Sequence, residues 1–134
     1  MSITIAVIDS ETLKLDPKHP ERVVVDEIGT VVFTPSVQSI TPAIIDELLE
    51  KAFDGIDRGQ AIDSGFHGCS INTLLVKLPL IEQFLAGREA SQDTVEWHRK
   101  RGYNPELESR TFSVSEAMAR VKKSIVDADV VYCR

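Results

Sequence analysis

The sequence has few of the residues that build metal centres and disulfide frameworks: 2 Cys, 3 His and 1 Trp among 134 residues. Cys69 and Cys133 are far apart, and no histidine stands at zinc-ligand spacing from a second histidine, cysteine or acid. A structural zinc site is therefore not expected. We interpret the two cysteines as reduced structural thiols, as is usual in cytosolic proteins.

Long apolar runs and an excess of positive charge are also missing. No segment approaches the roughly 20 apolar residues that span a bilayer, and the first nine residues lack the basic start of a secretory signal. No membrane contact and a cytoplasmic location are therefore expected. The net charge of −6 argues against holding nucleic acid by general electrostatics. The negative charge does not exclude an enzyme that binds a strand end through divalent cations, because the ions supply positive charge locally.

The length and the composition, with 43% hydrophobic and 27% charged residues, are typical of one soluble globular domain. Apolar periodicity and capping residues predict an alternation of strands and helices. The first expected strand is 3–9, and residues 22–33 are expected to form one long strand or a hairpin. A further strand is expected over 73–80, with Pro79 at an edge or strand end. The last, 129–133, is expected to be a core strand with one unprotected edge. The expected helices begin at Thr41-Pro42, near 81, near 92 and at Ser113, and residues 56–70 are expected to form a loop.

Two acids, Asp9 and Glu11, stand where the first apolar strand runs out. Residues i and i+2 of a strand point to the same face, so both carboxylates project together. Paired carboxylates suit Mg²⁺ or Mn²⁺, which prefer oxygen ligands. For the Asp-x-Glu pattern taken alone, a polar strand end with solvated acids is the favoured interpretation.

Three stretches together resemble the DEDD (DnaQ-like) 3′–5′ exonuclease superfamily. The resemblance is to its phage-type branch, which includes exonuclease VIII, and to the related 3′–5′ exoribonucleases. The first stretch is Val7-Ile-Asp-Ser-Glu-Thr12 with Val25-Asp-Glu-Ile-Gly-Thr-Val-Val-Phe33. The second is Leu75-Val-Lys-Leu78 with Gly87-Arg88 and Asp93-Thr-Val-Glu-Trp97, and the third is 112–134. Residues 40–70 look like an insertion into this pattern. The resemblance implies an α/β fold of ribonuclease H-like type, with a mixed sheet and flanking helices, apparently lacking its C-terminal strand and helices.

The resemblance also implies roles for individual residues. Asp9 would bridge two metal ions and Glu11 would bind the ion that activates the attacking water, which makes both residues catalytic and metal-binding. Thr12, with Ser10, would contact the terminal nucleotide. Trp97 would pack in the core, and His98 stands where the family has a second tryptophan.

The remaining acids and the general-base His or Tyr of the family lie beyond Arg134 in its pattern. Asp127 and Asp129 precede that motif and are interpreted as surface residues. The chain is therefore expected to carry the first half of an exonuclease site for a DNA or RNA 3′ end, and to be inactive or incomplete alone. A second chain or a homo-oligomer would complete the domain. The alternative is a catalytically inert exonuclease-derived module that binds a protein partner.

One basic run, residues 98–101, follows Trp97. It could touch a phosphate backbone, but a solvated helix face is the favoured interpretation.

Overall fold

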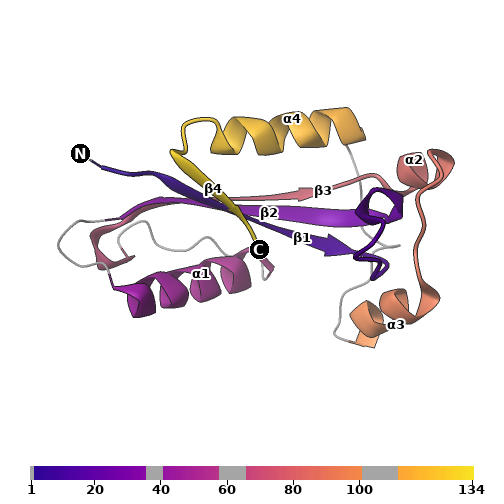
Figure 1. The fold of residues 1–134 in the computed structure, drawn as a ribbon, viewed down its shortest axis with the longest axis horizontal. Helices are drawn as coiled ribbons and strands as arrows, with labels where there is room; N and C mark the ends of the chain where they lie inside the picture. Colours follow the sequence, from indigo (N-terminus) through magenta and orange to yellow (C-terminus); the bar gives the residue numbers. More distant parts are fainter. Residues whose placement is uncertain (1, 36–40, 58–65, 101–111) are drawn as a thin grey trace. The chain divides into compact units, whose positions relative to one another are not determined.

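The computed structural model describes residues 2–35, 41–57, 66–100 and 112–134. The protein is α/β, with a mixed four-stranded sheet in the order β3-β2-β1-β4 and flanking helices (Figure 1). No helix among the described residues is long and apolar enough to cross a membrane. The strands are β1 (Ile5–Thr12), β2 (Val25–Thr34), β3 (Ser70–Lys77) and β4 (Val130–Cys133); the helices are α1 (Pro42–Asp57), α2 (Leu80–Leu85), α3 (Gln92–Lys100) and α4 (Val114–Ile125); the short turns are η1 (Pro20–Arg22) and η2 (Phe66–Gly68).

Most expected elements are confirmed, with shifted ends. Residues 25–34 form one long strand, and Gly29 lies inside it. β3 ends two residues before Pro79 and lies at one edge of the sheet, as its proline indicates. The predicted loop over 56–70 has its middle, 58–65, outside the described residues, and its ends belong to α1 and β3.

The chain divides into two compact units, each built from segments far apart in the sequence. β1, β2 and β3 each contribute residues to both units. The interpretation of 1–134 as a single partial exonuclease-like domain stays a prediction. The first unit comprises 1–9, 29–75 and 120–134, and the second comprises 10–28 and 76–119.

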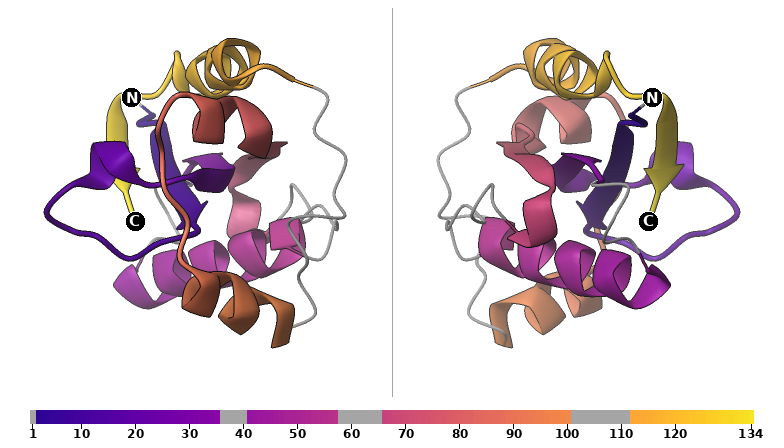
Figure 2. Two further views of the ribbon diagram at one scale, coloured as in Figure 1. Left: turned by 90° about the vertical axis from the view of Figure 1, so that its right-hand side faces the viewer. Right: turned by 90° about the vertical axis from the view of Figure 1, so that its left-hand side faces the viewer.

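The first unit has an apolar core between its strands and α1. The helix begins as its sequence predicts, with the Thr41 hydroxyl accepting a hydrogen bond from the Ile44 N–H at 3.3 Å. Its apolar face supplies four core residues and covers one face of the strands (Figure 2). The segment interpreted as an insertion therefore contributes directly to this core. The buried members are Val7, Val31, Phe33, Leu48, Ala52, Phe53, Ile56, Cys69 and Ile71.

Phe33 is the largest fully buried side chain of this core, at 1% exposure. Phe33→Ala removes its contacts and leaves a cavity, so we expect a loss of about 3–5 kcal/mol in the free energy of unfolding. Urea denaturation followed by circular dichroism measures it. Phe84→Ala is the matched control, because Phe84 is 47% exposed, and should change stability by no more than about 0.5 kcal/mol. Equal losses in the two variants would contradict the assigned core.

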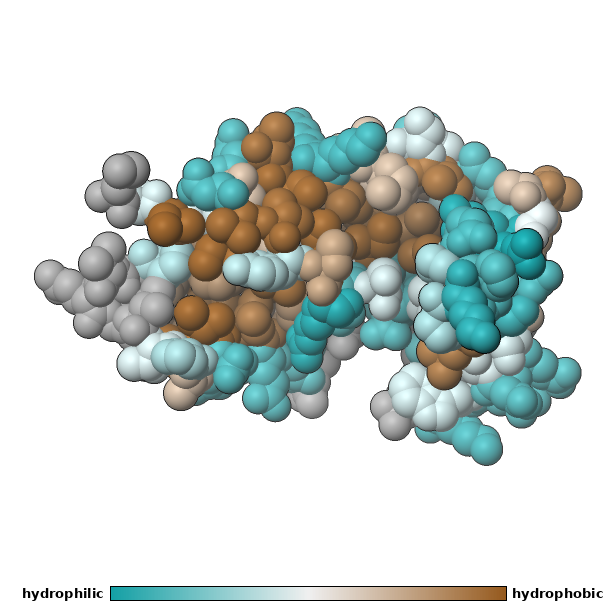
Figure 3. Space-filling model, in the orientation of Figure 1, coloured by the Kyte–Doolittle hydropathy of each residue, from teal (hydrophilic) through white to brown (hydrophobic). Residues whose placement is uncertain are grey.

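β4 forms the other edge of the sheet and is solvent-exposed along its whole length. It pairs in parallel with β1, from Ile5 opposite Val130 to Ile8 opposite Cys133. Apolar atoms gather on the surface over β4 (Figure 3). The predicted strand is confirmed, and among the described residues no strand pairs with its outer edge. Its interpretation as a core strand is wrong among the described residues: β1 takes the interior place, and Val130, Val131 and Tyr132 of β4 are 38–59% exposed.

Candidate metal and nucleic-acid site

Asp9 and Glu11 both lie on β1 and are half-buried. The strand forms here because all residues of the run Ile5–Ile8 are apolar and all but Ala6 are β-branched. The two central residues, Ala6 and Val7, are buried. Strand periodicity puts residues 9 and 11 on one face of β1 and Ser10 on the other. Asp9 is the last residue of its segment in the first unit, and Glu11 belongs to the second unit.

A pocket of about 430 Å³ in the second unit brings together two of the stretches that carried the resemblance. From the first motif it includes three of the four predicted site residues, Ser10, Glu11 and Thr12; Asp9 is not among its lining residues. From the start of α3 it includes Asp93 and Thr94. The remaining lining residues are Leu15, Trp97 and His98.

Backbone hydrogen bonds place α3 beside this end of β1. The extended segment before the helix forms a bridge between Glu89 and Val23, and the Val24 N–H donates to the Glu89 carbonyl at 2.9 Å. One residue before α3, the Ser91 N–H donates to the Leu13 carbonyl at 2.6 Å. These bonds use main-chain atoms alone, so sequence patterns carry little signal for them.

A buried glutamine fixes α2 against the start of β2. Gln83 is 3% exposed; its Oε1 accepts from the Val25 N–H at 2.9 Å, and its Nε2 donates to the Val25 carbonyl at 2.7 Å. Arg88 Nη1 donates to the Val23 carbonyl at 2.9 Å. Both side chains hold the segment that leads to α3.

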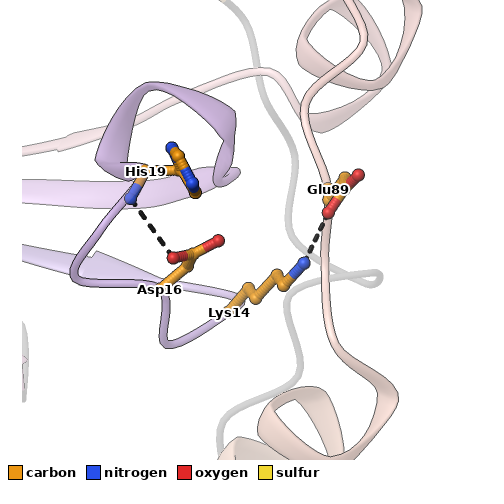
Figure 4. A network of polar contacts seen from close by, with 4 residues as sticks. All are labelled: Lys14, Asp16, His19 and Glu89. Carbon is orange, nitrogen blue, oxygen red and sulfur yellow. Dashed lines mark hydrogen bonds and ion pairs between the residues drawn. The ribbon is translucent and has the colours of Figure 1, made fainter.

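An ion pair adds a further tie, between Lys14 and Glu89 at 2.5 Å (Figure 4). In the same loop the Asp16 carboxylate accepts from the His19 N–H. The Lys14–Glu89 hydrogen bond raises the pKa of Lys14 and lowers the pKa of Glu89. The contribution of Glu89 is therefore lost as the pH falls through its depressed pKa, and that of Lys14 as the pH rises through its elevated pKa. Both side chains are well solvated, so the pair contributes little to stability at neutral pH.

The predicted burial of Trp97 is wrong. Trp97 is 50% exposed, whereas His98 is buried at 7%. The two rings meet edge to face with centroids 5.0 Å apart, and His98 Nε2 lies 3.4 Å from the Thr12 carbonyl oxygen. α3 has few apolar residues, and its packing turns the histidine inward. Trp97 is left on the pocket wall with an accessible ring.

The other charged candidates lie on the surface. Arg99 and Lys100 of the basic run are exposed on α3, which confirms a solvated helix face for these two; Arg101 lies outside the described residues. Asp127 and Asp129 are exposed as predicted, and the Asp129 carboxylate accepts from the Thr4 N–H at 2.8 Å. Asp129 therefore helps to fix the start of the β1–β4 pairing.

Within the described parts of the chain, no group of three or more His, Cys, Asp or Glu side chains is placed to hold a metal ion. Sequence reasoning quoted Asp93 as part of a helix motif but gave its carboxylate no role. Asp93 becomes a candidate site residue because it lines the same pocket as Glu11. No protein-family model matches the chain, and no curated protein matches it significantly.

Proposed function

We propose that the chain carries the first half of the active site of a metal-dependent 3′–5′ exonuclease with a ribonuclease H-like fold. One observation carries this proposal: two stretches about 80 residues apart, which resemble two motifs of the same exonuclease family, line one pocket. The mixed sheet with flanking helices is compatible with that fold. The substrate would be the 3′ end of single-stranded DNA or RNA.

The donor set suits Mg²⁺ or Mn²⁺ in kind, because Asp9 and Glu11 offer carboxylate oxygens on one strand face. When bound, two such ions would stabilise the charge that develops on a phosphodiester during in-line hydrolysis. Asp9 and Glu11 would hold them, together with acids from a second chain or a second copy of this one.

The rest of the pocket suits a terminal nucleotide. The accessible ring of Trp97 offers a base a stacking surface, and such stacking tolerates any base. Ser10 and Thr12 would contact the sugar and the 3′ end. The Thr12 hydroxyl donates to the Lys14 carbonyl at 3.1 Å, so its oxygen remains available as an acceptor.

Metal binding is the direct test. Calorimetric titration of the wild-type chain with Mn²⁺ should show weak binding, because two carboxylates leave most of the coordination to water. Asp9→Asn and Glu11→Gln should each abolish the signal. Glu96→Gln should leave it unchanged, since Glu96 is an exposed acid of α3 that is not among the lining residues of the pocket. Equal Mn²⁺ binding by wild type and Asp9→Asn would refute the assignment.

A second candidate function is an inert exonuclease-derived module that binds a protein partner. The exposed apolar edge strand β4 favours it, because an unpaired edge is a template for a strand from another chain. The two candidates differ in the metal titration: an inert module needs neither carboxylate, so the Asp9 and Glu11 variants would then behave like the wild type.

A further inference from the structure

A second pocket, of about 530 Å³, lies entirely within the first unit. Its polar wall comes from the face of β2 opposite the apolar core, from β3 and from the C-terminal half of α4. Thr30 alternates with the core residue Val31 along β2, so it points to the other face of the sheet. The polar lining residues are Thr30, Asn72, Thr73, Arg120, Lys123 and Ser124.

The charge of this pocket opposes the charge of the chain. The whole protein carries a net charge of −6, yet the pocket has two cations, Arg120 and Lys123, and none of its eight lining residues is acidic. The two cations are three residues apart on α4, so they share one face of the helix. Guanidinium, ammonium, hydroxyl and amide groups together supply many donors to an anion with several oxygen atoms.

Part of the polar wall is ordered before any ligand binds. Thr30 is 1% exposed, and its hydroxyl lies 3.1 Å from the hydroxyl of Ser124. The Ser124 hydroxyl donates to the Val121 carbonyl at 2.7 Å. Since that proton is used, Thr30 donates to Ser124. This chain of bonds fixes α4 against β2 beneath the two cations.

The same pocket has an apolar side, formed by Val32 and Leu74. Its volume falls in the range of about 300–1,000 Å³ that is usual for small-molecule sites. A cationic wall beside an apolar wall suits a molecule that joins a phosphate to a flat ring. We propose that this pocket binds a nucleoside monophosphate, with Arg120 and Lys123 on the phosphate and with Val32 and Leu74 against the base. The inference does not depend on the proposed function.

The competing explanation is a general preference of helix ends. Basic residues are favoured near a helix C-terminus because they complement its dipole, whatever else they do. Lys122 separates the two explanations: it is exposed on the same last turn and is not among the residues that line the pocket. Lys122→Ala removes the same charge as Lys123→Ala and is therefore the matched control.

The experiment titrates the chain with adenosine monophosphate and follows backbone amide signals by NMR. EDTA is present throughout, so that the nucleotide cannot bind through a metal at Asp9 and Glu11. We expect shifts at Thr30, Thr73 and Ser124. Arg120→Ala and Lys123→Ala should each weaken binding roughly 10- to 100-fold, as expected for loss of a charged hydrogen bond. Lys122→Ala should bind like the wild type.

Two further ligands test the cationic wall and the apolar wall of the pocket separately. Adenosine, which lacks the phosphate, and inorganic phosphate, which lacks the ring, should each bind more weakly than the nucleotide. Absence of nucleotide binding, equal weakening by Lys122→Ala and Lys123→Ala, or shifts only with single-stranded oligonucleotides would each overturn the proposal. Because EDTA removes metal, failure here leaves the exonuclease proposal standing, and loss of manganese binding in the earlier titration leaves this one standing.

Discussion

Trimming of a 5′-labelled oligonucleotide from its 3′ end is expected to stay at trace level when residues 1–134 are the only protein present. Two-metal hydrolysis needs both ions at a separation of roughly 3.5–4 Å, and two acids on one strand do not hold both. Adding a polypeptide with the remaining motifs of the exonuclease family that the chain resembles, a Gly-x-x-Phe-Asp strand and a later His-x-x-x-x-Asp, should produce a ladder of shortened labelled products with Mn²⁺.

Glu11→Gln should then remove the restored activity. Losing even an outer partner of a metal ligand typically costs 10- to 100-fold, so losing a ligand itself should reduce trimming by at least about 100-fold. Glu96→Gln is the control and should trim at the wild-type rate. Strong laddering by residues 1–134 alone would show that the missing acids are supplied by other residues of the chain or by a second copy of it. No laddering with the complement present would favour the inert binding module.

Self-association through β4 is the second large effect we expect. The Val130 N–H donates to the Thr4 carbonyl at 3.3 Å, and the Arg134 N–H donates to the Ile8 carbonyl at 2.7 Å. Successive residues of a strand direct their N–H groups to opposite sides. The N–H groups of Val131 and Cys133 therefore face the open edge, where a strand of another copy can accept them. Light scattering at high protein concentration should report a dimer or a larger assembly.

Val131→Pro tests this geometry. Proline removes one outward donor, and it is tolerated where the lost N–H faced away from the sheet, so β4 should keep its pairing with β1 while the assembly becomes monomeric. Val131→Thr keeps both the N–H and the β-branched shape and should associate like the wild type. A monomeric wild type with a sharp thermal transition would contradict pairing at this edge.

Local signals in the sequence predicted the elements well where side chains act on their own backbone. Thr41 and Ser113 each accept a hydrogen bond from the residue three positions later, at 3.3 Å and 3.1 Å, and each marks the start of its helix. The choice between one long strand and a hairpin over 22–33 stayed open, because β-rich residues favour both. Tertiary pairing decided it.

In the candidate site, too, local sequence signals were informative and tertiary contacts left no signal in the sequence. Strand periodicity placed Asp9 and Glu11 on one face without further information. The position of α3 depends on main-chain bonds from Glu89 and Ser91, which leave no pattern in residue types. The inward turn of His98 and the outward turn of Trp97 follow from that position. The family resemblance implied that Trp97 packs against the sheet, and that burial was therefore predicted wrongly.

The pairing of β1 with β4 has a consequence for synthesis. Ile5 and Val130 are partners across 125 positions of the chain, and closing so large a loop carries an entropic cost before any contact forms. A ribosome adding about 5–20 residues per second makes β4 roughly 6–25 s after β1. During that interval β1, which carries both proposed metal ligands, has an open edge of its own. β1, the strand that would hold the metal, therefore gains its second neighbouring strand only after β4 has been made.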